Sequence, residues 1–395
     1  MFRKMKGEKT LVFHCDTKII IENQSVQKLT AILKEHFPSV YRIMIVTDKG
    51  LMQLGMIQPI IDSLRESGYF VVSFDDVSQN PRDSECLKGA AIFKENNIDL
   101  VLAIGGGSPI DTAKTVALIG PNGGTPLEYF EKKREYQNMA PICCIPTTAG
   151  TGSEVTRSAV ITIAATHQKI TLKHPKLRPA LAVLDGELTA TVPPGITAAT
   201  GVDALVHAIE GYTCNVSNPV SKSLGAEAMR KIILNLPEAY MNGRNLKARS
   251  EMLEGSLLAG MCFGSADVAA VHCLAEALGS LYDTPHGIAN AVFLPYVLTF
   301  NAKYHVTIHA ELAKIMQFAN EEDDEKTAAA KLVSGIKAFT KSLGISKLTE
   351  LPGVNHEDIN RLAELAYMNG STASNVREIT LEDYIEILAE AFSDK

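Results

Sequence analysis

Three histidines and one aspartate in the second half of the chain have residue types and spacings that suit a metal site. Asp203 and His207 are four residues apart in a stretch with helical periodicity, so they share one face of the helix. His272 lies in a second helical stretch, and His286 follows a turn at residues 282–285. A single histidine on an apolar helix face is usually a hydrogen-bonded core residue. Together, the three imidazoles and the carboxylate favour a divalent first-row ion such as Fe(II) or Zn(II).

Such an ion would act as a Lewis acid on an alkoxide or carbonyl oxygen. It would stabilise the charge that this oxygen carries in the transition state of a hydride transfer. The ligand types do not choose the metal, because general affinity favours zinc over iron at most nitrogen and oxygen sites. The pattern therefore predicts a catalytic ion and leaves its identity open.

Two polar, glycine-rich segments each follow an apolar run that is typical of a buried strand. Residues 105–114, GGGSPIDTAK, come directly after the run 100–104, and residues 146–154, PTTAGTGSE, follow the run 142–145. Glycines let the backbone approach an anion, and a following helix offers free N–H groups. One such loop alone is explained by an ordinary tight turn, and neither has the GxGxxG or P-loop spacing. Two in succession predict a nucleotide site at the carboxyl edge of a parallel sheet.

Asp48 is the third candidate at this edge, because it stands just beyond the apolar run 42–46. A carboxylate there could accept hydrogen bonds from the adenosine ribose and would repel the extra phosphate of NADP. A helix N-cap explains the same residue equally well.

The elements that must position these residues differ between the two parts of the chain. From about residue 40 to 185, short apolar runs alternate with helical stretches near 50–67 and 83–96. The runs lie at 42–46, 69–73, 100–104 and 142–145. This alternation predicts βαβ units and a mostly parallel sheet. We expect an α/β dinucleotide-binding domain over residues 1–190.

Beyond VPPG at residues 192–195 the strand signal fades, and apolar residues recur at helical spacing. The helical stretches lie at 196–213, 219–241, 247–263, 267–281, 306–319, 325–342, 356–368 and 380–392. We expect an all-α metal-binding domain over residues 191–395.

Composition limits the class of protein. The length of 395 residues suits two domains, and 46% apolar with 21% charged residues is typical of a globular protein. A formal net charge of −7 without long basic runs argues against nucleic acid or a membrane surface as partner.

We find no signal-peptide pattern and no apolar run that could span a bilayer. Seven scattered cysteines without a CxxC pair predict reduced thiols, so we expect a cytoplasmic protein.

Four segments together resemble the iron-containing (group III) alcohol dehydrogenase family. They are GGGSPIDTAK (105–114), PTTAGTGSE (146–154), GVDALVHAIEGY (201–212) and VHCLAEALGSLYDTPHGIANAVFLP (271–295). Their order and spacing fit over nearly the whole chain. The resemblance implies a dehydroquinate synthase-like architecture with the active site in the cleft between the two domains. It also implies an NAD-linked oxidoreductase that interconverts a small primary alcohol and its aldehyde by hydride transfer, with the substrate oxygen on a divalent metal.

The resemblance also assigns roles to individual residues. The family's four metal ligands match Asp203, His207, His272 and His286. The cofactor-binding positions in and after the two loops match Gly105, Gly106, Gly107, Ser108, Asp111, Thr147, Thr148, Thr151, Thr156 and Ser158. Lys169 matches a lysine at the nicotinamide ribose, Leu188 lines the same pocket, and Asn80 is a candidate on the adenosine side. Asp48 stands where NAD-preferring members carry an acid, so we expect NAD rather than NADP.

One position departs from the family pattern. Many members carry a further histidine four residues after the third ligand, and this chain has Glu276 there. Because His272 and Glu276 are four apart on a helix, the carboxylate should face the cleft. We hypothesise that it acts as base or proton relay; the alternative is that it only orients a ligand or a water. The segment 264–270 also differs from the glycine-richer family form, which leaves the substrate open.

Other functions remain as alternatives. A glycerol-dehydrogenase-like polyol oxidation with zinc, or the reduction of a specialised functionalised aldehyde, would use the same fold. A catalytically silent nucleotide-binding sensor is the non-enzyme alternative, and the presence of all four candidate ligands argues against it. Because dimers and larger assemblies are ordinary in the family, we expect a homodimer or larger homo-oligomer. We expect its substrate to be a small alcohol or aldehyde.

Overall fold

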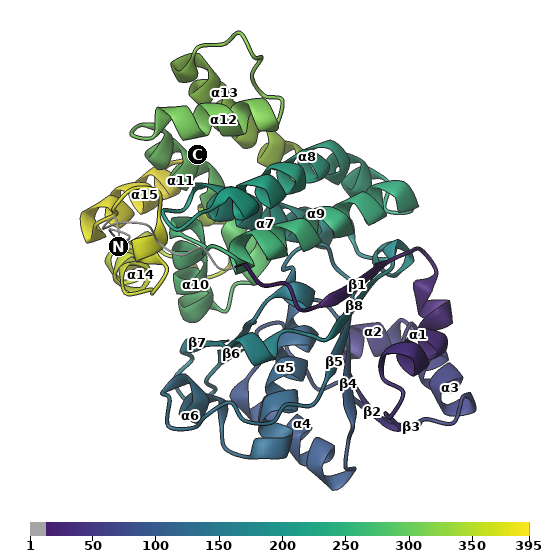
Figure 1. Ribbon diagram of the computed structural model, residues 1–395. Coiled ribbons are helices and arrows are strands. Elements are labelled where there is room, and N and C mark those ends of the chain that lie inside the picture. The colour runs from purple at the N-terminus through teal and green to yellow at the C-terminus, as the bar shows by residue number, and fades with distance from the viewer. Residues whose placement is uncertain (1–12, 395) are drawn as a thin grey trace, which may run out of the picture.

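The computed structural model describes residues 13–394 as two stacked parts. An α/β domain lies below and a helical region lies above in Figure 1. The predicted fold class is confirmed: the sheet of the first domain is parallel, and only helices follow it in the second half of the chain.

The main sheet has six strands, all parallel, in the order β1-β8-β5-β4-β2-β3. Their bounds are β1 Lys18–Ile21, β2 Arg42–Val46, β3 Phe70–Phe74, β4 Leu100–Gly105, β5 Ile142–Pro146 and β8 Leu181–Leu184. The four apolar runs of the sequence thus form β2, β3, β4 and β5. The strand order reverses between β2 and β4, and the carboxyl ends of strands at such a reversal form the ligand crevice of open α/β sheets.

Helices cover both faces of this sheet, which explains why its central strands are apolar throughout. On β2, Ile43 and Ile45 join a core cluster with α1 (Leu29–His36) and α3 (Gln58–Glu66). Met44 and Val46 point to the other face, toward α4 (Asp83–Glu95) and α5 (Gly107–Asn122).

The helix expected near 50–67 is in fact two helices, α2 (Lys49–Gln53) and α3. Gly55 between them has a φ of 71°, and Pro59 stands in the first turn of α3. A left-handed glycine and a proline that begins a helix both interrupt a continuous helix.

The sequence analysis missed an antiparallel hairpin of β6 (Ser158–Thr162) and β7 (Lys169–Lys173). Its inward residues Ala159, Ile161, Ile170 and Leu172 pack with Leu118 of α5, while α6 (Pro126–Phe130) lies beside β7. The hairpin matters for the site because it carries Ser158 and Lys169.

The helical region holds the largest apolar cluster of the molecule. Its helices are α7 Pro194–Thr213, α8 Pro219–Met241, α9 Leu246–Gly264, α10 Ala270–Tyr282, α11 His286–Ala302, α12 Val306–Ile315, α13 Glu325–Ser342, α14 Ile359–Tyr367 and α15 Leu381–Ser393. Of these, α11 was not predicted, because nearly all of it is buried and it shows no alternation of apolar and polar faces. Within residues 13–394, none of the helices is long and apolar enough to cross a membrane.

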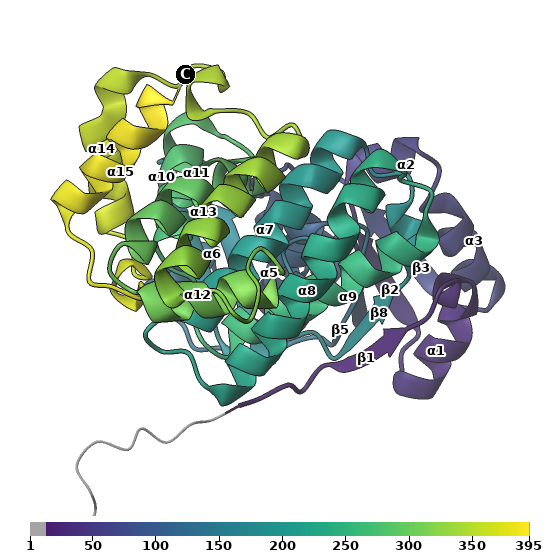
Figure 2. The same ribbon diagram turned by 90° about the horizontal axis from the view of Figure 1, so that it is seen from above.

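The second glycine-rich loop lies where the two parts meet. A Cβ atom on Gly150 would come within 2.8 Å of the Cβ atom of Thr200 on α7. Gly152 has a φ of 58°, and a Cβ atom there would lie 2.5 Å from the Cα atom of Gly260 on α9. Figure 2, seen from above, shows the helical region spread over the α/β domain. The loop therefore contacts both parts directly, and glycine makes that approach possible.

Candidate metal centre and cofactor cleft

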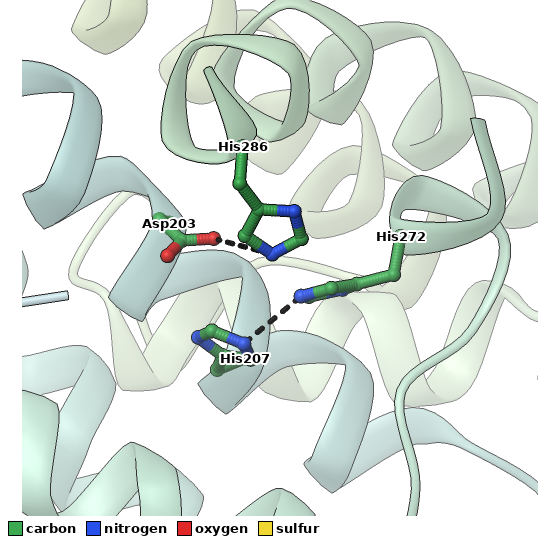
Figure 3. Close-up of side chains that lie close together, drawn as sticks. All are labelled: Asp203, His207, His272 and His286. Atoms are coloured by element: carbon green, nitrogen blue, oxygen red, sulfur yellow. Dashed lines mark hydrogen bonds and ion pairs between the residues drawn. The ribbon is translucent and has the colours of Figure 1, made fainter. Parts of the chain in front are cut away.

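The four candidate metal ligands converge from three helices. Asp203 and His207 come from α7, His272 from α10, and His286 is the first residue of α11. One possible ligand atom from each lies within 4.8 Å of the others. The Nε2 atoms of His272 and His207 are 2.9 Å apart, and Nε2 of His286 is 3.7 Å from Oδ1 of Asp203 (Figure 3). Sequence spacing alone placed only Asp203 and His207 next to each other.

This arrangement fits a divalent cation. The two facing imidazole nitrogens, 2.9 Å apart, can share one proton as a hydrogen bond, and a cation that binds both lone pairs would replace that proton. Three ring nitrogens and one carboxylate oxygen are donors that Fe(II) and Zn(II) accept. The side chain of His286 is 32% exposed, whereas that of Asp203 is 1% exposed. The His286 side of the cluster is therefore the one that solvent can reach.

Burial and mutual charge set the ionisation of the four groups. Burial lowers the pKa of His207 to about 3 and that of His286 to about 4, although the Asp203 carboxylate opposes both shifts. Burial would raise the pKa of Asp203, but the three imidazoles outweigh it and hold the pKa below its usual range. His207 and His286 are thus neutral at neutral pH, which is the form that binds a metal ion.

Glu210 is a functional residue that the sequence analysis missed. It lies on α7 with 3% of its surface exposed and accepts hydrogen bonds from the backbone N–H groups of Ala269 and Val271, at 2.8 and 2.7 Å. Its Oε2 atom is also 2.6 Å from Nδ1 of His272. A proton on Nδ1 donated to this carboxylate leaves Nε2 of His272 free to bind a cation. Burial would lower the pKa of His272, but the Glu210 carboxylate raises it overall.

Asn290 contacts the facing atoms of two other candidate ligands. Its side chain is fully buried on α11, and Nδ2 donates to Oδ1 of Asp203 at 2.6 Å and lies 3.1 Å from Nε2 of His286. Phe263 completes the surroundings, because its ring stacks on His207 with centroids 4.3 Å apart. The donors are therefore fixed before any ligand arrives.

The two glycine-rich loops lie side by side at the carboxyl ends of β4 and β5. A Cβ atom on Gly106 would come within 3.1 Å of Oγ1 of Thr148, and one on Gly107 within 2.7 Å of Cγ2 of Thr151. No side chain caps the start of α5 at Gly106. Its first N–H groups therefore remain available to an anion, and the positive end of the helix dipole favours one.

Three of the predicted cofactor residues, Asp111, Thr156 and Ser158, also take part in a buried clamp next to the loops. The Lys114 side chain is fully buried and its Nζ atom donates to Oγ1 of Thr156 at 3.1 Å and to the backbone oxygen of Ser158 at 2.7 Å. Asp111 accepts a hydrogen bond from the backbone N–H of Val160 at 2.9 Å, and its other oxygen is 3.8 Å from Lys114. The clamp fixes α5 to the hairpin, which supports an indirect role for Asp111.

The remaining cofactor candidates lie on separate elements of the α/β domain. Asp48 caps α2, since its Oδ1 atom accepts from the N–H of Leu51 at 3.0 Å. Asn80 is buried and its Oδ1 atom accepts from Nζ of Lys169 at 3.0 Å. Leu188 packs against the core cluster on the α1 and α3 side of the sheet, whereas Lys169 stands on the hairpin over α5.

Glu276 lies between the metal centre and Lys169. On α10 it follows His272 by one turn, and Gly279 farther along the same face would place a Cβ atom 2.5 Å from Nζ of Lys169. Its carboxylate is half-buried, and Oε2 accepts from Nδ2 of Asn369 at 2.6 Å. The side chain is therefore held by a neighbour of the helical region.

Comparison with known proteins agrees with this geometry. Residues 16–186 match the profile of the iron-containing alcohol dehydrogenase family, and residues 197–392 match that of the C-terminal part of Fe-containing alcohol dehydrogenases. The chain is 36% identical to a 1,3-propanediol dehydrogenase of Citrobacter freundii over 89% of this chain and 91% of that protein. It is 35% identical to an NAD-dependent methanol dehydrogenase of Bacillus methanolicus over 89% and 92%. A solved 1,3-propanediol oxidoreductase superposes with a TM-score of 0.92 at 33% identity, covering 97% of this chain and 100% of that one.

The chain belongs to the iron-containing alcohol dehydrogenase family. It is an NAD-linked oxidoreductase of the alcohol dehydrogenase class, which interconverts alcohols and aldehydes.

Proposed function

We propose that this enzyme interconverts a small primary alcohol and its aldehyde with NAD, and that Asp203, His207, His272 and His286 hold Fe(II). The observation that supports this most is the convergence of these four donors where α7, α10 and α11 meet. We also propose that the cofactor-binding part ends near residue 190, because the last strand ends at Leu184 and α7 begins at Pro194.

The bound ion would supply Lewis-acid polarisation of the substrate oxygen. Glu210 and Asn290 hold the donor atoms in place, so little reorganisation accompanies the reaction. The N-terminus of α5 and the adjacent threonine loop would bind the cofactor diphosphate, and Lys169 would bind the nicotinamide ribose. The nicotinamide, when bound, would supply or accept the hydride at the substrate carbon.

Two features favour NAD over NADP and a small substrate. Asp48 stands beyond β2 at the reversal of strand order, where its carboxylate would repel a ribose phosphate. The relatives are named for methanol, 1,3-propanediol and lactaldehyde, all short oxygenated compounds. A reducing, cytoplasmic environment is part of the proposal and is supported by the seven free cysteines. We also expect a homo-oligomer, and light scattering would give its size.

Anaerobic assays of nicotinamide absorbance test the proposal. Metal-stripped, Fe(II)-loaded and Zn(II)-loaded enzyme would be compared with NAD and NADP on a panel of short alcohols and aldehydes. We expect turnover with NAD that disappears on stripping and returns with Fe(II). His207→Asn should abolish it, and His309→Asn is the matched control because His309 is a buried histidine on α12 bonded only to the backbone oxygen of His305.

Other outcomes would change the assignment. Recovery with Zn(II) but not Fe(II), together with a preference for polyols, would favour the glycerol-dehydrogenase-like alternative. Binding of NADH without turnover under any metal would favour a catalytically silent sensor.

A further inference from the structure

A chain of polar contacts connects the two parts of the molecule beside the metal centre. Asp283 ends α10, and its Oδ1 atom accepts from Nδ2 of Asn80 at 2.8 Å. Asn80 in turn accepts from Nζ of Lys169 at 3.0 Å through Oδ1. The amide of Asn80 is buried and uses both of its ends, one for each partner. The two contacts join a helix of the helical region to two segments of the α/β domain.

Asp283 adopts an unusual backbone conformation at this place. Its φ is 54°, in the left-handed region that glycine and asparagine adopt most easily and aspartate tolerates. A helix that only needed to end there would do so at least as well with glycine. The carboxylate of Asp283 is therefore not needed to end the helix, and its contacts with other side chains explain why it is there.

The carboxylate of Asp283 also meets Arg82, whose Nη2 atom is 3.3 Å from Oδ2. The two side chains are 26% and 62% exposed, so this ion pair by itself is worth little. The contact with buried Asn80 is the stronger one, because a buried amide left without a partner is costly.

This chain of contacts has the candidate metal ligands at one end and the candidate cofactor residues at the other. Asp283 lies three residues before His286 and follows the helix that carries His272. Lys169 reaches α10 at Gly279, where the absence of a side chain leaves room for its ammonium group. The backbone oxygen of Gln79, next to Asn80, accepts a hydrogen bond from Ser108 of the first glycine-rich loop. Cofactor and metal residues are thus linked through one carboxylate.

We propose that Asp283 is a positioning residue that, through Asn80, holds Lys169 at the nicotinamide ribose and sets the cofactor against the metal ligands. The inference rests on the proposed function, because it takes Lys169 to lie beside the cofactor. It requires that loss of the Asp283 carboxylate weakens cofactor binding while the metal centre and the fold stay intact.

Asp283→Gly is the decisive variant, because glycine keeps the left-handed conformation and removes only the side chain. We expect the KM for NAD and the dissociation constant of NADH, measured by fluorescence, to rise roughly tenfold, the scale of losing one hydrogen bond to a charged group. Metal content should stay unchanged, and Tm should fall by no more than a few degrees, because the buried Asn80 amide loses one partner. Asp283→Asn keeps an acceptor for Asn80 and should remain within about threefold of wild type.

Two further variants separate positioning from a general effect. Gln317→Gly, at another left-handed residue beyond the end of α12, should leave NADH binding unchanged. Combined with Lys169→Met, Asp283→Gly should add little to the loss that Lys169→Met causes alone, because both act through one contact chain.

The outcomes distinguish this inference from the proposed function. Wild-type turnover with unchanged NADH binding in Asp283→Gly would overturn the inference and leave the function standing. So would independent, additive losses in the double variant. If the wild-type protein bound no NADH, the proposed function would fail, and the inference would fail with it.

Discussion

At the scale of single residues, Glu210 leads to a prediction about metal affinity. Its carboxylate accepts three hydrogen bonds and has contact with only one metal-site imidazole, that of His272. Glu210→Gln keeps the size of the side chain but removes the charge that fixes the proton on Nδ1 of His272. We expect metal affinity to fall about 10- to 100-fold, measured by competition with a chelator. Glu227→Gln, on the surface of α8, is the control, and equal affinities in both variants would refute this role.

Glu276 carries a second prediction at the same scale. One of its oxygens is held by Asn369, and the side chain stands between the metal site and Lys169. If it relays the substrate proton, Glu276→Gln should lower kcat and remove one limb of its pH profile. Glu276→Gln with full turnover and an unchanged profile would instead support a purely orienting role.

The residues at the site were only partly predictable. Asp203 and His207 could be paired from the sequence, since four residues separate them on one helix. The partnership of Glu210 with His272 spans 62 residues and depends on how two helices pack, which no local pattern encodes. Lys114 was hidden for another reason: a lysine that is fully buried is rare, and its sequence neighbours do not reveal its partners.

At the scale of elements, the contact of the second loop with α9 depends on two glycines. A Cβ atom on Gly260 would lie 2.8 Å from both the Cα and the oxygen atom of Gly152, and backbone atoms cannot rotate away. Gly260→Ala should therefore move the loop and raise the KM for NAD, at a stability cost of about 1–3 kcal/mol. Gly195→Ala has free space and is the control. A Gly260→Ala enzyme with normal cofactor kinetics would show that the loop position is irrelevant.

The short helical turn after this loop predicts a pH effect on stability. Burial raises the pKa of Glu154 from 4.5 to about 7, although Lys114 of α5 opposes the shift. The folded protein thus binds the Glu154 proton more tightly than the unfolded chain does. The stability that this proton adds is fully present below pH 4.5 and is lost as the pH rises to 7. Relative to Glu154→Gln, wild type should lose roughly 3 kcal/mol between pH 5 and 8. Unfolding curves at a series of pH values would show this, and a constant difference would contradict it.

Elements were predicted well where a pattern was long or repeated. Apolar runs bounded by turns gave β2 to β5, and helical spacing gave α7 to α10. Strands β6 and β7 are as long as β2, but polar residues flank or interrupt their apolar positions, so they do not form a clear apolar run. Helix α11 was missed because nearly all of it is buried, so it shows no alternation of apolar and polar faces.

At the scale of the whole molecule, the metal centre joins three helices, so a bound ion should stabilise the fold. An ion present at 1,000 times its dissociation constant adds about 4 kcal/mol, on the order of 10 °C in Tm for a region of this size. Calorimetry of stripped and Fe(II)-loaded protein would measure the shift. His207→Asn should show none of it, whereas an equal shift in that variant would place the stabilising ion elsewhere.

The burial of α11 also has a consequence for the order of assembly. This helix has almost no polar face, so it gains stability only when neighbouring helices surround it. His286, its first residue, can therefore reach the other ligands only after the helical region has condensed. Folding would thus deliver the last candidate donor before an ion could bind all four. Cells grown without iron should then accumulate a folded, metal-free enzyme that becomes active within minutes of exposure to the ion.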